Sequence, residues 1–263
     1  MADALFSAYI GVAAVVKVDW GAVILNAVIP SLSFERSSLA ALIAIFGTTI
    51  SPYLFFWQTS EEVEEEIEHP DLTVDSSHIR TMRKDVMAGM AAAVVVMAAI
   101  MIATSETLGA SGISQIETAD DAARALRPIA GDLAGTIFAL GIIGTGALAV
   151  PVLFAATGYA LSEAFGWSEG LSKRLREAPG FYVVIAVALV LALALGFGGL
   201  DPVRGLYYAA ILNGVVAPPL ILLMLLLGRS ESMGEHRSGW LSVTLTGTTC
   251  LVMAVAPLAY LIA

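Results

Sequence analysis

Long uncharged apolar runs constrain this chain more than any other feature. A helix rises about 1.5 Å per residue, so crossing the roughly 30 Å hydrocarbon layer of a bilayer takes about 20 apolar residues. Uncharged runs of that order lie at 86–104, 133–162, 181–200, 205–228 and 240–263. A soluble core could not bury so many apolar residues, which make up 58% of the chain. Transmembrane β-strands would alternate apolar and polar residues, so the runs predict an all-α transmembrane protein.

Two further segments complete the expected set of spans. The stretch 37–57 is long enough to cross a bilayer but is interrupted by Pro52. The uncharged segment between Asp3 and Lys17 is too short for a full span, and we expect it to be the end of a helix whose beginning lies outside this chain. One transmembrane domain is expected over residues 1–263, with spans at 3–16 (partial), 37–57 (broken), 86–105, 133–162, 181–199, 205–228 and 240–263.

Basic residues predict the orientation of these spans. Lys and Arg in short loops favour the cytoplasmic side. When the loops are assigned alternately to the two sides, one side has eight basic residues and the other has five. The richer side contains the loops 58–85 and 172–180. We therefore expect both loops to be cytoplasmic in a multi-pass protein of the cell membrane.

Charge and residue usage argue against several other classes of protein. The net charge is −10 and no basic stripe is present, so nucleic acid is not an expected partner. The single cysteine, Cys250, excludes an intramolecular disulfide and a cysteine metal cluster. The apolar runs hold no Ser–His or paired-Asp arrangement, so we expect neither an enzyme nor a cofactor.

An acidic run follows the broken span. Its glutamates are Glu61, Glu62, Glu64, Glu65, Glu66 and Glu68. They could gather cations near the mouth of a pathway, or they could be the solvated end of a helix that projects beyond the bilayer. The sequence leaves both interpretations open.

The most informative stretch is Gly47-Thr48-Thr49-Ile50-Ser51-Pro52-Tyr53, within the broken span. Proline removes a backbone hydrogen bond and disfavours helical angles in the residue before it. Non-helical backbone within a membrane can offer carbonyl oxygens to a cation. Alternatively, the stretch is a proline kink in which Ser and Thr hydroxyls satisfy the freed backbone groups.

This stretch resembles the sixth transmembrane helix of the NRAMP family of divalent-metal transporters, whose pattern reads Gly-Ala-Thr-Val-Met-Pro-His. Asp19-Trp20-Gly21-Ala22 with Pro30 is similar to the family's segment between helices five and six. Ile211-Leu212-Asn213-Gly214-Val215-Val216 is similar to the start of its tenth helix. The order and spacing of the spans agree with helices five to eleven, which are the later two-thirds of the family's length.

The resemblance implies a fold and a metal site. NRAMP proteins have a LeuT-type fold of two inverted five-helix repeats, with the metal held between unwound parts of helices one and six. The expected fold here is therefore an incomplete bundle of that type. The carbonyl of Thr48 would face the metal, Ser51 stands at the family's methionine, and Tyr53 at its histidine. Gln58 falls where a second histidine often occurs, and Asn213 would either face the site or hydrogen-bond to another helix.

These departures from the family pattern have chemical consequences. Hydroxyl and carbonyl oxygens suit Mg²⁺, Ca²⁺ or Mn²⁺, whereas thioether sulfur favours softer ions. Ser51 should therefore relax discrimination against hard ions. His69, His78 and His236 all fall in expected loops, so we expect passive or weakly proton-coupled transport.

One family motif is absent. The first NRAMP helix carries an Asp-Pro-Gly motif whose aspartate is the main anionic metal ligand, and this chain has no such motif. We expect transport of a divalent metal ion across the lipid bilayer only when a partner chain or further sequence supplies helices one to four. The alternatives are a non-transporting membrane scaffold or degenerate fragment, and a transporter of an organic solute with the same fold.

Overall fold

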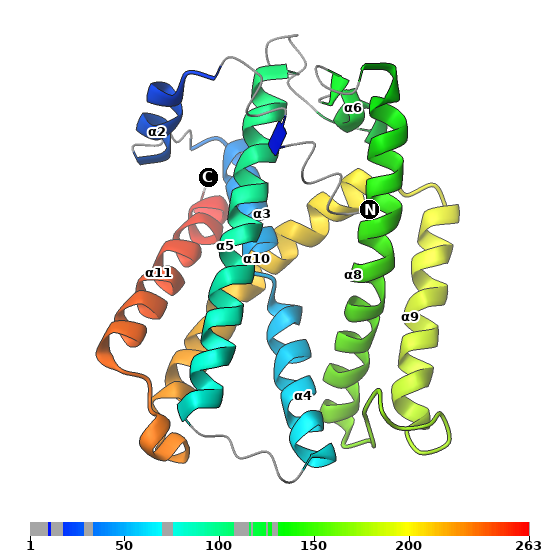
Figure 1. The fold of residues 1–263 in the computed structure, drawn as a ribbon, viewed down its shortest axis with the longest axis vertical. Coiled ribbons are helices and arrows are strands. Elements are labelled where there is room, and N and C mark those ends of the chain that lie inside the picture. The colour runs from blue at the N-terminus through cyan, green and yellow to red at the C-terminus, as the bar shows by residue number, and fades with distance from the viewer. Residues whose placement is uncertain are drawn as a thin grey trace. The chain divides into compact units, whose positions relative to one another are not determined.

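The computed structural model describes residues 10–11, 18–28, 34–69, 76–107, 116, 118–124, 126–127 and 131–262. Every regular element in this part of the chain is a helix (Figure 1). The expected all-α class is therefore confirmed. The expected partial span 3–16 lies outside the described residues, except for the helical pair Ile10 and Gly11.

Six helical segments are long and apolar enough to cross a membrane. The first combines α3 (Arg36–Thr49) and α4 (Pro52–Glu68). The others are α5 (Ser76–Thr107), α8 (Ala134–Phe165), which the turn η2 (Gly131–Leu133) precedes, α9 (Pro179–Phe197), α10 (Pro202–Gly228) and α11 (Trp240–Ile262). The shorter elements are α2 (Trp20–Val28), α6 (Ala119–Arg124) and η3 (Glu231–His236).

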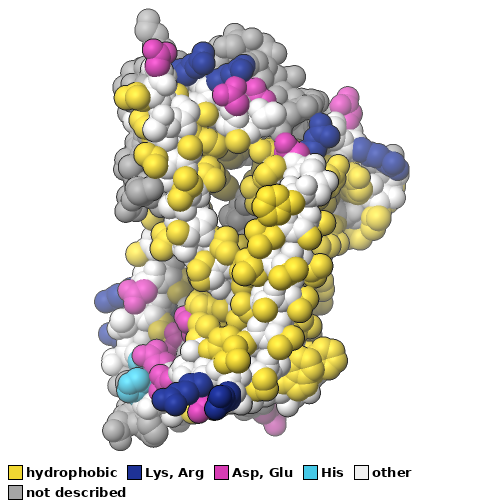
Figure 2. Space-filling model, turned by 90° about the vertical axis from the view of Figure 1, so that its right-hand side faces the viewer, with side chains coloured by type: hydrophobic (Ala, Val, Ile, Leu, Met, Phe, Trp, Pro, Cys, Tyr) yellow, Lys and Arg dark blue, Asp and Glu magenta, His cyan; other side chains and the backbone are white. Residues whose placement is uncertain are grey.

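The surfaces of the long helices are apolar. Leu148 on α8, Leu191 on α9 and Leu226 on α10 are 69%, 57% and 61% exposed. On the face drawn in Figure 2, hydrophobic side chains dominate the helices and the charged side chains gather toward helix ends. Such surfaces are stable against lipid rather than water, because lipid tails are as apolar as the side chains.

The helices continue beyond the apolar runs. Most of the stretch 58–85, which the sequence suggested to be a loop, is helical, because α4 continues to Glu68 and α5 begins at Ser76. His78 accordingly lies in the first turn of α5, where its Nε2 is 3.9 Å from Glu62 Oε2, and not in a loop. Charged residues are compatible with a helix once it reaches water, so charge marked the end of an apolar run and not the end of the helix.

Contacts divide the chain into two compact units. One contains Met1–Pro30 and Trp57–Leu195, and the other contains Ser31–Phe56 and Gly196–Ala263. The second unit therefore holds α3, the first turn of α4, α10 and α11, and the first holds the rest of α4 with α5, α8 and most of α9.

In the second unit, α3, α10 and α11 pack on one another. Ala217 and Ile221 of α10 form a buried cluster with Met253 of α11, and Phe46 and Ile50 of α3 pack against it. Cys250 adjoins the same cluster, and its thiol donates a hydrogen bond to the carbonyl of Pro218 over 3.3 Å. This environment is that of a structural cysteine.

Two glycines allow α3 and α10 to cross at backbone contact. A Cβ atom at Gly47 would overlap the carbonyl oxygen of Ala210 and the backbone of Gly214. A Cβ atom at Gly214 would likewise overlap the carbonyl oxygen of Ile43. Small residues at such crossings let membrane helices approach closely. The position of α10 against the end of α3 therefore depends on both glycines.

The core of the first unit is aromatic. Tyr159 of α8, only 2% exposed, lies between Trp57 of α4 and Phe181 of α9, with ring centroids 6.2 and 4.9 Å away. Phe181 also packs on Gly158, where a Cβ atom would come within 2.8 Å of its ring. Ala155 and Ala178 complete the buried cluster.

Gly214→Ala should destabilise the second unit. The added methyl group meets backbone that cannot rotate away, and overpacking of this kind costs about 1–3 kcal/mol. A thermal melt of the detergent-solubilised protein should show a melting temperature several degrees lower. Gly146→Ala on α8 is the control, because a Cβ atom there meets nothing within 4 Å. Equal melting temperatures for the two variants would contradict the backbone contact.

Candidate metal site

The candidate site is the break between α3 and α4. Helix α3 ends at Thr49, and Ile50 has an extended backbone with φ −118° and ψ 92°. Ser51 is not helical, and Pro52 begins α4 (Figure 1). The break follows from Pro52, which has no N–H to donate to the preceding turn and restricts the residue before it.

Side-chain hydroxyls donate to backbone carbonyls around the break. The Ser51 hydroxyl donates to the carbonyl of Gly47 over 3.2 Å and lies 3.5 Å from the carbonyl oxygen of Thr48. The Thr49 hydroxyl donates to the carbonyl of Ile45 over 2.6 Å. The Ser51 bond is the one that a proline kink with hydroxyl repair requires, whereas the Thr49 bond is the back-bonding that threonines also make in the unbroken helix α11. The Ser51 bond uses the hydrogen of its hydroxyl and leaves lone pairs on its oxygen.

The structure brings four of the five candidate residues into one unit. Ser51 is buried at the break with 7% exposure, while Thr48 is exposed on the last turn of α3. Tyr53 is half-buried on the first turn of α4, and Asn213 is half-buried on α10, next to the glycine that contacts α3. Gln58 is exposed on α4 and belongs to the other unit.

All of these donors are uncharged oxygens, from carbonyl, hydroxyl, phenol and amide groups. Among the described residues, no group of three or more His, Cys, Asp or Glu side chains is arranged to hold a metal ion. Uncharged oxygen donors suit hard divalent ions but leave the charge of the ion uncompensated. The dipole of α3 helps a cation, because the carbonyl end of this helix points into the break.

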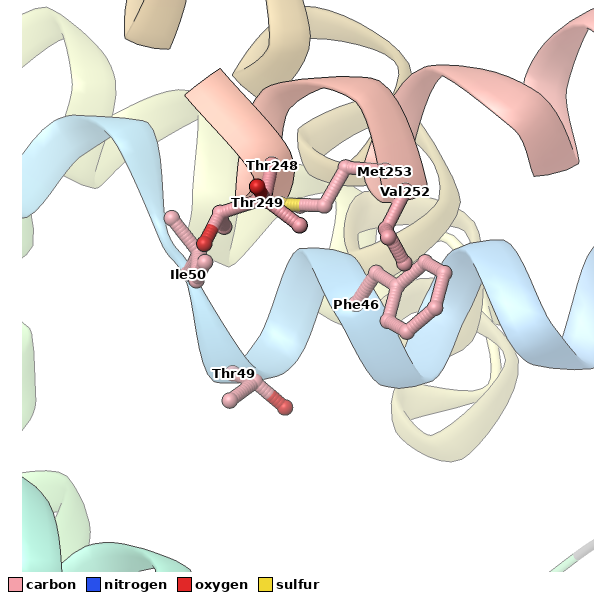
Figure 3. A pocket seen from close by; sticks show the side chains of 7 residues that line it. All are labelled: Phe46, Thr49, Ile50, Thr248, Thr249, Val252 and Met253. Carbon is pink, nitrogen blue, oxygen red and sulfur yellow. The ribbon is translucent and has the colours of Figure 1, made fainter. Parts of the chain in front are cut away.

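A cavity of about 240 Å³ adjoins the break, between the end of α3 and α11 (Figure 3). Its walls are Phe46, Thr49, Ile50, Thr248, Thr249, Val252 and Met253. The hydroxyls of Thr248 and Thr249 donate to carbonyls one turn earlier in α11, over 2.8 and 3.0 Å. Figure 3 shows the Thr49 side chain pointing away from these α11 residues. The cavity is mainly apolar, so the candidate cation donors are those at the break itself.

The one Asp-Pro pair in the chain has a different role. Asp201 is the N-cap of α10, and its Oδ1 accepts hydrogen bonds from the N–H groups of Val203 and Arg204 over 2.9 and 3.1 Å. Pro202 occupies the first turn, where its missing N–H leaves no partner unsatisfied. Capping accounts for this pair, which supplies no carboxylate to the break.

Comparison with known proteins identifies the family. The family model for natural resistance-associated macrophage protein-like (Nramp) sequences matches residues 4–263. The chain belongs to the Nramp family. It is a multi-pass membrane protein, because that match is joined by six helical segments able to cross a bilayer.

Three bacterial relatives are each named divalent metal cation transporter MntH. The Nramp chain is 24% identical to the protein of Burkholderia ambifaria over 97% of its own length and 55% of the relative's. It is 24% identical to that of Clostridium acetobutylicum over 82% and 47% of the two lengths. For Caldanaerobacter subterraneus subsp. tengcongensis the identity is 23%, over 81% and 48%. The chain thus spans about half the length of the curated relatives it matches.

Two structural features of this Nramp chain were missed in the sequence. The first is the close contact between Gly47 and Gly214, although a glycine beside Asn213 in an apolar helix was a usable signal. The second is the role of Glu64, because the sequence analysis treated all glutamates of the acidic run alike. Its carboxylate accepts hydrogen bonds from the backbone N–H groups of Leu171 and Ser172. Glu61, Glu65 and Glu68 are exposed.

Pro52→Ala should restore helix across the break, because alanine supplies the missing N–H and has the best helix propensity. Hydrogen–deuterium exchange of residues 49–53 should slow by about tenfold or more, which corresponds to about 1.4 kcal/mol of added protection. Pro257→Ala in α11, where the helix continues through proline, is the control. Exchange that stays fast in Pro52→Ala would show that another constraint maintains the break.

Proposed function

We propose that this Nramp chain forms part of a divalent-metal transporter and supplies oxygen donors to the metal from its broken helix. The observation that carries the proposal is the interruption of an apolar span at Ile50 and Ser51. Backbone polar groups in a membrane are costly unless paired. A break within an apolar span therefore suggests a function that offsets this cost. The curated relatives are named as divalent metal cation transporters, which supports this assignment.

The proposed donors are the carbonyl of Thr48 and the side-chain oxygen of Ser51, followed by Tyr53. Ser51 is the central residue, since it is buried and its hydroxyl contacts the carbonyls on the α3 side of the break. Asn213 is a weaker candidate that would reach the ion from α10. Gln58 is the weakest, because the other unit contains it.

A complete site needs an anionic ligand. Among the residues of the second unit whose side chains are described, the acidic ones are Glu35, Asp201 and Glu231, all at helix ends. We propose that an aspartate from outside residues 1–263 compensates the charge of the ion, in a partner chain or in further sequence. With oxygen donors alone, the site would favour Mg²⁺, Ca²⁺ or Mn²⁺ over soft ions. No resident cofactor is part of this proposal, since the metal is the substrate.

The proposed orientation places the end of α4 and the α8–α9 connection in the cytoplasm. The hydrogen bonds from Leu171 and Ser172 to Glu64 support a common side for these two segments. A common side is what the alternation of spans and the bias of basic residues require.

Divalent ions should raise the thermal stability of the purified full-length protein. A ligand that binds only the folded state adds about 2.7 kcal/mol at one hundred times its dissociation constant. Melting temperatures should rise with Mg²⁺ or Mn²⁺. In Ser51→Cys, a near-isosteric change from oxygen to sulfur, preference should shift about tenfold toward Cd²⁺.

The control for that shift is Ser105→Cys, at an exposed position on α5. No stabilisation by any divalent ion would overturn the metal assignment and favour a scaffold. Stabilisation by a small organic solute instead would favour a solute transporter of the same fold.

Metal uptake should be passive or only weakly coupled to protons. The described histidines lie at or beyond helix ends: His69 follows α4, His78 is in the first turn of α5, and His236 ends η3. Histidine is the usual group that titrates near neutral pH. In proteoliposomes, Mn²⁺ uptake should change little when an inward pH gradient is imposed. A fixed number of protons moved per metal ion would contradict this prediction.

A further inference from the structure

The carboxylate of Glu64 joins α4 to the connection between α8 and α9. Its Oε1 accepts a hydrogen bond from the backbone N–H of Ser172 over 2.7 Å. Its Oε2 accepts from the N–H of Leu171 over 3.1 Å and from the hydroxyl of Tyr159. The Leu171 N–H also lies 3.2 Å from the Tyr159 hydroxyl oxygen. Both carboxylate oxygens are therefore used as acceptors.

The backbone of the α8–α9 connection leaves room for this carboxylate. Gly170 has φ +135°, a conformation that disfavours side chains, and a Cβ atom there would come within 3.0 Å of Glu64 Oε1. The hydroxyl of Tyr182 on α9 donates to the carbonyl of Lys173 over 2.7 Å, which fixes the far side of the same turn. The backbone N–H groups of residues 171 and 172 are thus presented toward α4.

Other contacts also restrain this part of α4. Glu62 Oε2 lies 3.9 Å from His78 Nε2 of α5. The ring of Trp57 meets Tyr159 edge-on. Most of the remaining side chains from Gln58 to Glu68 are exposed. The hydrogen bonds of Glu64 are therefore a directional restraint on the second half of this helix, together with the contact between Glu62 and His78.

We propose that Glu64 is a positioning residue whose bonds to residues 171 and 172 form a reversible latch on the broken helix. Rupture of the latch exposes little apolar surface, and at a helix end water can replace each bond. Its closure therefore restrains the second half of α4 against the α8–α9 connection at small energetic cost. The transport role of the latch rests on the proposed function, whereas its effect on α4 does not.

The closest test is Glu64→Gln. A glutamine has one acceptor oxygen in place of two, so it cannot keep all the hydrogen bonds that Oε1 and Oε2 of Glu64 accept separately. Tyr159→Phe removes one donor to the carboxylate and keeps the ring contacts with Trp57 and Phe181. Glu65→Gln is the matched control, because Glu65 lines the same acidic hollow on α4 without bonding the connection. Gly170→Ala perturbs the same hydrogen bonds from the α8–α9 connection, because its methyl group would meet the Glu64 carboxylate.

Hydrogen–deuterium exchange of the full-length protein gives the first readout. Exchange at residues 170–173 should accelerate about tenfold in Glu64→Gln, Tyr159→Phe and Gly170→Ala, and should not change in Glu65→Gln. Metal uptake gives the second readout. The maximal rate should fall about tenfold in the latch variants, while the half-saturating metal concentration stays within about twofold, because the proposed donors are untouched.

Unchanged exchange in Glu64→Gln would overturn the latch. Faster exchange with an unchanged maximal rate would overturn its role in transport, as would a rise in half-saturating concentration at a constant maximal rate. If the parent protein moves no metal, the proposed function fails, and the exchange measurement still decides whether Glu64 holds the α8–α9 connection.

Discussion

Pro52 has no backbone N–H, and within an apolar span this missing donor has consequences for every group around it. Lipid offers no water to the carbonyls that lose their helical partners, so the protein must satisfy them. The Ser51 hydroxyl does so for Gly47 and approaches the carbonyl of Thr48. The chain then restarts as a new helix, and the carbonyl end of α3 remains as a centre of negative potential. The candidate site is thus a consequence of one proline.

The position of the end of α3 depends on a close crossing with α10. Gly47 and Gly214 bring the backbones of α3 and α10 into direct contact, and Asn213 is the chain neighbour of Gly214 on α10. A side chain at position 214 would overlap the carbonyl oxygen of Ile43, so the crossing could not accommodate one without a shift of α3 or α10. Gly214 therefore permits the close approach of the two helices.

The two units rely on different kinds of interaction. In the second unit, α3, α10 and α11 pack over small residues and a shared apolar cluster. In the first, α4 is fixed by a carboxylate, two backbone N–H groups and an aromatic cluster around Tyr159. Packed helices resist displacement along their whole length, whereas a few hydrogen bonds at a helix end can open without loss of a core. The proposed latch therefore acts on α4 and not on α3.

The sequence by itself determined the all-α membrane class and the family, because apolar runs of about 20 residues have one stable form in a bilayer and the Gly47–Tyr53 stretch is distinctive. It also indicated Pro52 as a disruption. The ends of α4 and α5 were not predictable from apolar runs, since charged residues also form helix once they reach water. Only the tertiary structure decided that Gly47 meets Gly214 and that Glu64, rather than its five neighbours, binds the α8–α9 connection. Both are contacts between residues more than one hundred positions apart, and local patterns of hydropathy and charge carry no information about such pairs.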